Sequence, residues 1–244
     1  VCCCAAPARQ IRAGLAASGN HKHQNTMTGK TETAPPDALL LMGRQCPYCP
    51  TVLRNLQSLR NEGVLGTLET VVIEDHPEVA AEHGVRSVPW VQIGPFELPG
   101  LRSVEELRGW AEKAGTREGM ANYFAELIGS GNIDKCLQLI ETDSRRIHAL
   151  VMLFTDTGTE LNIRIGISAI MESLQGSTAL AGIGDKLREL LKHDEPRIRG
   201  DACHYLALSG LTDAGDWIKP LLEDPDSNVR EIAADSLAEL ESSG

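Results

Sequence analysis

The segment Cys46-Pro47-Tyr48-Cys49 constrains this chain more than any other feature of its sequence. It follows a short apolar run at 39–42 and precedes a segment with helical spacing. Two cysteines three residues apart at the start of a helix can close a disulfide or stay open as a dithiol. Because a helix N-terminus carries unpaired N–H groups and a positive dipole end, it stabilises a thiolate on the first cysteine. The segment therefore predicts thiol–disulfide exchange chemistry on a strand–loop–helix unit.

The stretch 37–115 alternates between short apolar runs and short helical patterns. Ser103, followed by glutamates at 105 and 106, is a typical helix cap before the last of these helices. The expected order of elements is βαβαββα, which indicates a small α/β domain. We expect strands at 39–42, 68–73, 90–93 and 96–98, and helices at 50–61, 77–83 and 104–113.

The stretch 117–244 has a different texture, with consecutive helical patterns, short breaks and no convincing strand. Three similar triplets, at 162–164, 197–199 and 228–230, each start a helix. Their apolar central residues align: Ile163, Ile198 and Val229. Partner helices are expected before two of them, at 186–192 and 216–222. A unit that recurs every 30 to 35 residues is typical of a two-helix solenoid, here about four helix pairs. The fold class is therefore α/β plus all-α.

The net charge of −11 argues against a nucleic-acid binder that relies on a basic face. The sequence has no apolar run long enough to predict a membrane span. Seven cysteines in scattered positions do not form the even, spaced framework of a secreted domain, so a reducing, cytoplasmic compartment is expected.

The stretch 1–36 is expected to be a disordered N-terminal extension. Its first 26 residues lack an apolar core, which argues against a secretory signal. Met27 stands just before a Thr- and Pro-rich stretch and is a candidate for the true start of the protein. The cysteines Cys2, Cys3 and Cys4 have metal binding as an alternative reading.

The stretch 37–115 resembles the thioredoxin superfamily, on the glutaredoxin side. The resemblance rests on the CPYC segment, on the run from Asp75 to Ala80 that leads into Gly84, on Val88-Pro89 before a strand, and on Pro99-Gly100 before the last helix. It is most similar to the glutaredoxin-like units of archaeal protein disulfide oxidoreductases and to the N-terminal unit of the alkyl hydroperoxide reductase flavoprotein.

The resemblance implies roles for the two cysteines and for the Val-Pro pair. Cys46 is the expected nucleophile and Cys49 the resolving cysteine. Pro89 is expected in the cis form against the cysteines, and the backbone of Val88 is expected to pair with substrate like an added strand.

Three further substrate-binding residues follow from the same resemblance. Tyr48 would shape the substrate groove, and Gly100 falls where glutaredoxins approach glutathione. Arg44 lies close to the basic residue that glutaredoxins keep upstream of CPYC. Thioredoxins have a buried Asp in the preceding strand, and the run 39–42 has no carboxylate there.

The stretch 117–244 resembles HEAT-like repeats of the phycobiliprotein-lyase type. Asp226, Val229-Arg230 and the run from Ala233 to Leu237 carry the resemblance. In that family these positions belong to turns, core and hydrogen bonds between repeats. The usual use of such a stack is binding on an extended surface.

These features together predict a thiol–disulfide oxidoreductase whose HEAT-like platform binds a protein client. The alternative is a non-enzymatic HEAT-repeat scaffold in which the CxxC pair acts as a redox switch. No bound cofactor or metal is expected. Glutathione or a protein dithiol, kept reduced by a reductase, is the expected electron donor, and neither nucleic acid nor membrane is an expected partner.

The remaining candidate residues have simpler interpretations. Zinc at the CxxC pair lacks a second pair of ligands in the domain. Cys136 stands on an apolar helical face and reads as core, and Cys203 reads as core or half-exposed. His76 and His83 are expected at the surface, and Trp90 is expected to point inward from its strand or to touch substrate.

Overall fold

A computed structural model describes residues 34–242. The expectations for Met27, for Cys2, Cys3 and Cys4, and for most of the extension at 1–36 fall outside these residues.

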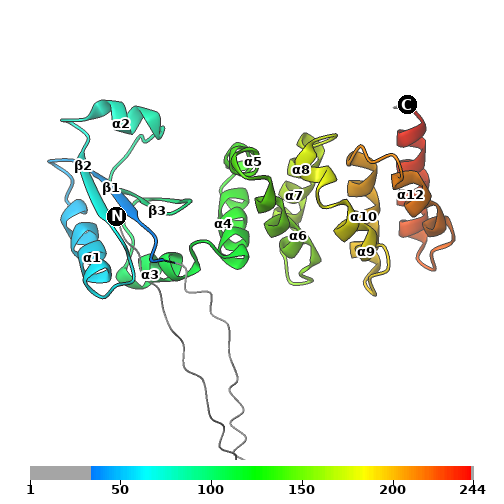
Figure 1. Cartoon of the computed structure of the whole chain (residues 1–244), viewed down its shortest axis with the longest axis horizontal. Helices are drawn as coiled ribbons and strands as arrows, with labels where there is room; N and C mark the ends of the chain where they lie inside the picture. The colour runs from blue at the N-terminus through cyan, green and yellow to red at the C-terminus, as the bar shows by residue number, and fades with distance from the viewer. Residues whose placement is uncertain (1–33, 243–244) are drawn as a thin grey trace, which may run out of the picture. The chain divides into compact units, whose positions relative to one another are not determined.

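The first part of the chain forms a four-stranded mixed sheet in the order β2-β1-β3-β4 (Figure 1). Strand β1 pairs in parallel with β2 and antiparallel with β3, and β3 pairs antiparallel with β4. The expected strand order along the chain is confirmed, with bounds that move by one residue at three strands. The strands are β1 (Ala38–Met42), β2 (Leu68–Val72), β3 (Trp90–Ile93) and β4 (Phe96–Pro99).

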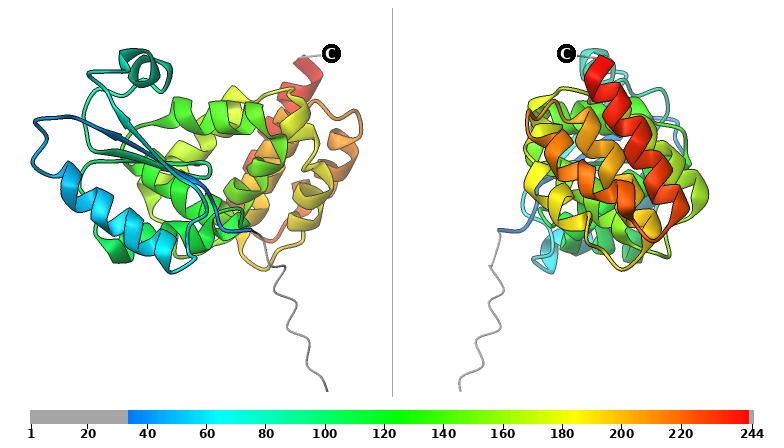
Figure 2. Two further views of the ribbon diagram at one scale, coloured as in Figure 1. Left: turned by 60° about the vertical axis from the view of Figure 1, so that its left-hand side comes forward. Right: turned by 90° about the vertical axis from the view of Figure 1, so that its right-hand side faces the viewer.

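Helices cover both faces of this sheet because successive side chains of β1 point to opposite sides. Leu40 lies in the core beneath α1 (Cys49–Asn61) and α3 (Val104–Lys113). Leu41 lies in a smaller cluster that includes Val79 of α2 (Pro77–Glu82). Figure 2 shows α1 on one side of the strands and α2 on the other. Ser103 caps α3 in a full capping box with Glu106, as expected.

Helices alone make up the described residues from 116 to 242, so the expected change of fold class is confirmed. Each helix packs mainly on its near neighbours in the chain, as in a solenoid. The α-helices are α4 (Arg117–Gly129), α5 (Ile133–Thr142), α6 (Ile147–Thr155), α7 (Leu161–Ser173), α8 (Thr178–Ala181), α9 (Gly184–Leu190), α10 (Pro196–Leu208), α11 (Ala214–Ile218) and α12 (Ser227–Ser242), with 3₁₀ segments η1 (Ser144–Arg146) and η2 (Lys219–Glu223).

Two of the expected partner helices differ in detail. The segment expected at 216–222 is divided into α11 and η2, because Pro220 has no N–H to continue an α-helical ladder. The segment expected at 186–192 begins earlier, at Gly184, and ends at Leu190. The helices expected after the aligned triplets are present as α7, α10 and α12.

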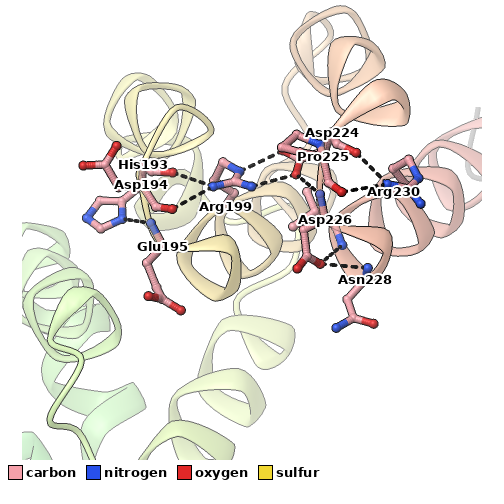
Figure 3. A network of polar contacts seen from close by, with 10 residues as sticks. His193, Asp194, Glu195, Arg199, Asp224, Pro225, Asp226, Asn228 and Arg230 are labelled. Carbon is pink, nitrogen blue, oxygen red and sulfur yellow. Dashed lines mark hydrogen bonds and ion pairs between the residues drawn. The ribbon is translucent and has the colours of Figure 1, made fainter.

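Equivalent arginines fasten the turns of two successive repeats (Figure 3). Arg199 Nη1 donates to the carbonyl oxygens of His193 and Asp194, six and five residues earlier. Arg230 Nη1 donates to the carbonyl oxygens of Asp224 and Pro225 at the same separations. The repeat inferred from the triplets is therefore also a repeat of hydrogen bonds.

The outer edge of the sheet is covered by the first helix of the solenoid. Tyr123 of α4 accepts the backbone N–H of Glu97 on edge strand β4 at 3.0 Å and lies 3.3 Å from its carbonyl oxygen. The Tyr123 ring packs against Phe96 of β4 and Trp110 of α3, with centroids 5.2 and 5.8 Å away. One buried core therefore runs from the sheet into the repeats.

Candidate functional site

Cys46 and Cys49 form a disulfide, with their Cα atoms 5.5 Å apart. Helix α1 begins at Cys49, one residue before the expected start. No side chain caps this helix at its N-cap residue, Tyr48. The backbone N–H of Cys49 donates instead to Cys46 Sγ at 3.1 Å, so the sulfur occupies the place of a capping acceptor.

The two sulfurs differ in access. The Cys49 residue is fully buried, whereas Cys46 is half-buried at the mouth of the loop. The end of the helix favours negative charge at Cys46, because one N–H is already directed at its sulfur. Cys46 is therefore the more accessible of the two sulfurs.

The Val88–Pro89 peptide bond is cis, as the resemblance implies. The Val88 carbonyl oxygen lies 3.7 Å from Cys46 Sγ, so the turn stands directly beside the reactive sulfur. Within residues 34–242, the backbone N–H of Val88 has no hydrogen-bond acceptor. This backbone is therefore available to an extended peptide.

Gly100 closes the same side of the site. Its N–H donates to the carbonyl oxygen of Pro89 at 2.8 Å, and its φ of 85° is a conformation that favours glycine. The segment that follows is also held, because Asn55 of α1 donates to the carbonyl oxygen of Arg102 at 3.2 Å. Leu101, between these two anchors, is 53% exposed.

An exposed apolar rim borders the dithiol. Tyr48, inside the CPYC segment, is 56% exposed, and Leu101 is its counterpart on the β4–α3 connection. Both are large apolar side chains at the surface. Tyr48 was expected from the sequence, whereas Leu101 was not expected as a contact residue.

Arg44 is held by two neighbouring acidic residues. Its guanidinium is ion-paired with Asp75, and its backbone N–H donates to Glu74 Oε1 at 3.0 Å. Both acids come from the loop after β2, thirty residues along the chain, and sequence reasoning did not connect them with the site. Because the Arg44 charge is matched by Asp75, the helix end remains the main source of positive potential at Cys46.

Gly43 permits a close approach around the reactive loop. A Cβ atom at this position would lie 3.1 Å from Val88 Cγ2, 3.3 Å from Glu74 Oε1 and 3.8 Å from Cys46 Cβ. The last residue before the loop therefore stands where the cis turn, the acidic loop and the nucleophile meet. The only signal for this close approach in the sequence was the glycine itself, placed directly after the strand.

The other described cysteines are core residues. Cys136 and Cys203 are fully buried. Burial raises the pKa of Cys136 to about 12 and that of Cys203 to about 11. Because the thiolate is the reactive form, these thiols are inert in the folded protein.

The aromatic and imidazole groups near the site are placed by packing. Trp90 is 5% exposed and points inward, as one of the two expectations had it. The ring of His83 is 5.1 Å from that of Trp90, so His83 is packed rather than fully exposed. His76 is exposed and contacts Glu78.

Neither a metal site nor a membrane-spanning helix is found in the part of the chain that the structure describes. Residues 34–242 contain no group of three or more His, Cys, Asp or Glu side chains placed to hold a metal ion. None of the helices in this part of the chain has the length and apolar character needed to cross a bilayer.

The mixed sheet, the dithiol at a helix end and the cis-proline turn define a thioredoxin-like domain, and a helical repeat stack follows it. Comparison with family models agrees on both parts. Residues 38–112 match the model of a thioredoxin domain, and residues 179–243 match the model of HEAT repeats. No curated protein matches the sequence. The chain thus has a thioredoxin-like domain fused to C-terminal HEAT repeats, as the sequence resemblance implied.

Proposed function

We propose that this protein is a thiol–disulfide oxidoreductase that acts on a protein client. The observation that carries the proposal is the placement of half-buried Cys46 beside both the start of α1 and the carbonyl of Val88. A redox switch in a scaffold needs two cysteines, but it does not need a substrate-pairing turn beside them. The joint presence of the dithiol and the Val88-Pro89 turn beside it therefore favours an enzyme.

The exchange runs in two balanced steps when the dithiol is the reductant. The Cys46 thiolate attacks one sulfur of the client disulfide, a mixed disulfide forms, and the other client sulfur leaves as a thiolate. Cys49 then loses its proton to solvent and its thiolate attacks Cys46 Sγ. The client leaves with both sulfurs reduced, and the Cys46–Cys49 disulfide holds the oxidised state. The reverse sequence oxidises a client dithiol.

The client would lie across the rim as an extended segment. Its backbone would pair with Val88, and its side chains would contact Tyr48 on one side and Leu101 on the other. Such a mode combines backbone hydrogen bonds for affinity with side-chain contacts for selection. Gly100 supports this groove because its N–H fixes Pro89.

A donor must return the disulfide to the dithiol. Glutathione, or a protein dithiol kept reduced by a reductase, would supply the two electrons. Arg44 is exposed beside the loop, where a carboxylate of glutathione or of the client would meet it once Asp75 yields. A cytoplasmic, reducing compartment fits the scattered positions of the seven cysteines. Besides the dithiol, the structure describes two of them, and both are buried free thiols.

The HEAT repeats would contribute partner choice. The stretch 116–244 has 12 basic and 22 acidic residues, which favours a neutral or basic client face. Contacts of this kind weaken as salt rises, because exposed charges are screened within about 10 Å at moderate ionic strength.

Trapping and activity measurements on single-cysteine variants test the function. Cys49→Ser should accumulate mixed disulfides through Cys46, because the attack proceeds and nothing resolves the adduct. Wild type should reduce insulin, or a glutathione mixed disulfide, in an assay coupled to a reductase. Cys46→Ser should do neither.

The matched control is Cys203→Ser, which removes a thiol of the repeats and leaves the dithiol intact. It should retain exchange activity. Exchange-inactive wild-type protein with a reversible Cys46–Cys49 disulfide would support the scaffold with a redox switch. If only glutathione is trapped on Cys49→Ser, the repeats do not serve as the client platform.

A further inference from the structure

A second cleft lies at the end of the sheet that faces away from the dithiol. It has a volume of about 910 Å³ and is lined by the β3–β4 turn, the start of α4, the end of α5, η1 and the start of α6. In the sheet register Ile93 pairs with Ala38 at the beginning of β1, whereas the CPYC segment follows Met42 at its end. A molecule in this cleft therefore does not meet Cys46.

The two carboxylates of the cleft are already matched by cations. Asp143 accepts from Nε and Nη2 of Arg145, each at 2.9 Å, and this pairing lowers the Asp143 pKa to about 2. Glu97 is ion-paired with Lys135 at 2.6 Å. Neither carboxylate needs a bound cation to balance its charge.

Further basic groups in the same cleft are not matched. The side chain of Arg117, in the first turn of α4, makes no hydrogen bond or ion pair with any residue from 34 to 242. Arg146 uses Nη1 to bind the carbonyl oxygen of Leu139, and its guanidinium forms no ion pair among the described residues, although its charge also acts on Asp143. The pKa of His148 is lowered, first by the burial of its imidazole and second by the positive charge of Arg117 nearby. The cleft has a surplus of positive charge in a chain of net charge −11.

The remaining lining is mixed: Pro95, Met120, Leu139 and Ala149 supply apolar surface, and Gln92, Thr116 and Thr142 supply uncharged polar groups. Small-molecule sites typically have volumes of about 300–1,000 Å³, with a mainly apolar lining and a few converging polar groups. We propose that this cleft binds a small organic anion, in which a phosphate or carboxylate group contacts Arg117 and Arg146 and an apolar or aromatic body lies on Met120 and Leu139.

Anion titrations of the full-length protein test the proposal. The probes are ADP, inorganic pyrophosphate and citrate, with adenosine as the uncharged comparison. At millimolar concentrations ADP should raise the unfolding temperature in a concentration-dependent way, since it binds only the folded state, and adenosine should not. Comparison of the effects of pyrophosphate and citrate separates a phosphate site from a carboxylate site.

The discriminating variant is Arg117→Gln, because this side chain holds no other part of the structure. Calorimetric titration should show ADP binding weakened by about tenfold or more, the usual scale of a lost charge-assisted hydrogen bond. Arg60→Gln changes an exposed arginine of α1 outside the cleft and should bind ADP like wild type. Cys46→Ser should also bind it normally.

Two results would overturn the proposal. One is the absence of stabilisation by any of the three anions. The other is ADP binding that is equal in wild type and in Arg117→Gln, in a variant whose circular dichroism shows a normal fold. Each result is independent of exchange activity at the dithiol, so the cleft and the oxidoreductase function stand or fall separately.

Discussion

Replacement of Arg199 by Met should destabilise the repeats far more than the same change at Arg230. Both arginines bind two turn carbonyl oxygens (Figure 3). Only Arg199 also makes a bidentate pair with Asp224, through Nε to Oδ2 at 2.8 Å and Nη2 to Oδ1 at 2.7 Å. The side chains of this pair are only 11% and 7% exposed.

The size of the destabilisation in Arg199→Met follows from the Asp224 carboxylate, which stays buried without its partner. Loss of one partner of a buried ion pair costs about 3–5 kcal/mol, because the other charge stays buried and unpaired. Arg230→Met loses two hydrogen bonds to carbonyl oxygens, worth about 1–2 kcal/mol together. Because two carbonyl hydrogen bonds are lost in each variant, these losses cancel, and the two variants should differ by the cost of the broken ion pair, about 3–5 kcal/mol in free energy of unfolding. Urea unfolding followed by circular dichroism measures this difference.

A second substitution tests the reason for the effect. In Arg199→Met with Asp224→Asn the buried charge is gone, while the amide oxygen can still accept the Asp226 N–H that Asp224 holds at 2.9 Å. The double variant should recover much of the loss, which appears as a coupling energy in the double-mutant cycle. Equal destabilisation by Arg199→Met and Arg230→Met, or strictly additive effects, would refute the reasoning.

The pH dependence of this pair has a definite sign. Arg199 lowers the pKa of Asp224 in the folded state below its unfolded value. The stabilisation is therefore present above the unfolded pKa of about 3.9 and disappears as pH falls through the folded pKa. The difference between wild type and Arg199→Met should be largest near neutral pH and should shrink in acid.

Further predictions concern the junction, the reactive loop and the thiols. Tyr123→Phe removes both contacts to the Glu97 backbone and should cost about 1–3 kcal/mol in urea unfolding, because buried backbone groups lose their partner. Gly43→Ala should slow exchange several-fold in the insulin assay while the fold survives, because its Cβ presses on Val88 and Glu74; an unchanged rate would show that the close approach has no role. Alkylation of the reduced protein, followed by peptide mapping, should label Cys46 first, with an apparent pKa below about 8.5. Preferential labelling of Cys203 would contradict the burial argument.

The sequence predicted the elements whose signals are local. The CPYC loop, the Ser103 cap and the apolar run of β1 each depend on residues close together in the chain, and the match of residues 38–112 to a thioredoxin domain agrees with them. The cis form of Pro89 came from resemblance, since a single sequence has no local signal for it. The triplet spacing gave the repeats, but it did not reveal where Pro220 divides a helix.

Long-range contacts were beyond such reasoning. Glu74 and Asp75 meet Arg44 across thirty residues of chain, and nothing in their local sequence indicates that the loops approach each other. The anion cleft joins β4, α4 and η1, so its charge surplus depends on which carboxylates are already paired. That Glu97 pairs with Lys135 is visible only in the folded structure, where α5 lies beside β4. That Asp143 pairs with Arg145 is likewise known only from the structure.

The solenoid is attached to the strand that ends at the reactive site. One end of β4 is tied to the cis turn, because Gly100 donates to Pro89. The middle of β4 is tied to α4, because Tyr123 binds both backbone groups of Glu97. Strand β4 is short, so these attachments are only three residues apart. If a client or an anion displaces α4, the support of β4 changes, and with it the groove beside Cys46. Exchange rates measured on Tyr123→Phe, at temperatures where it remains folded, test this coupling: a slower rate supports it, and an unchanged rate limits Tyr123 to stability.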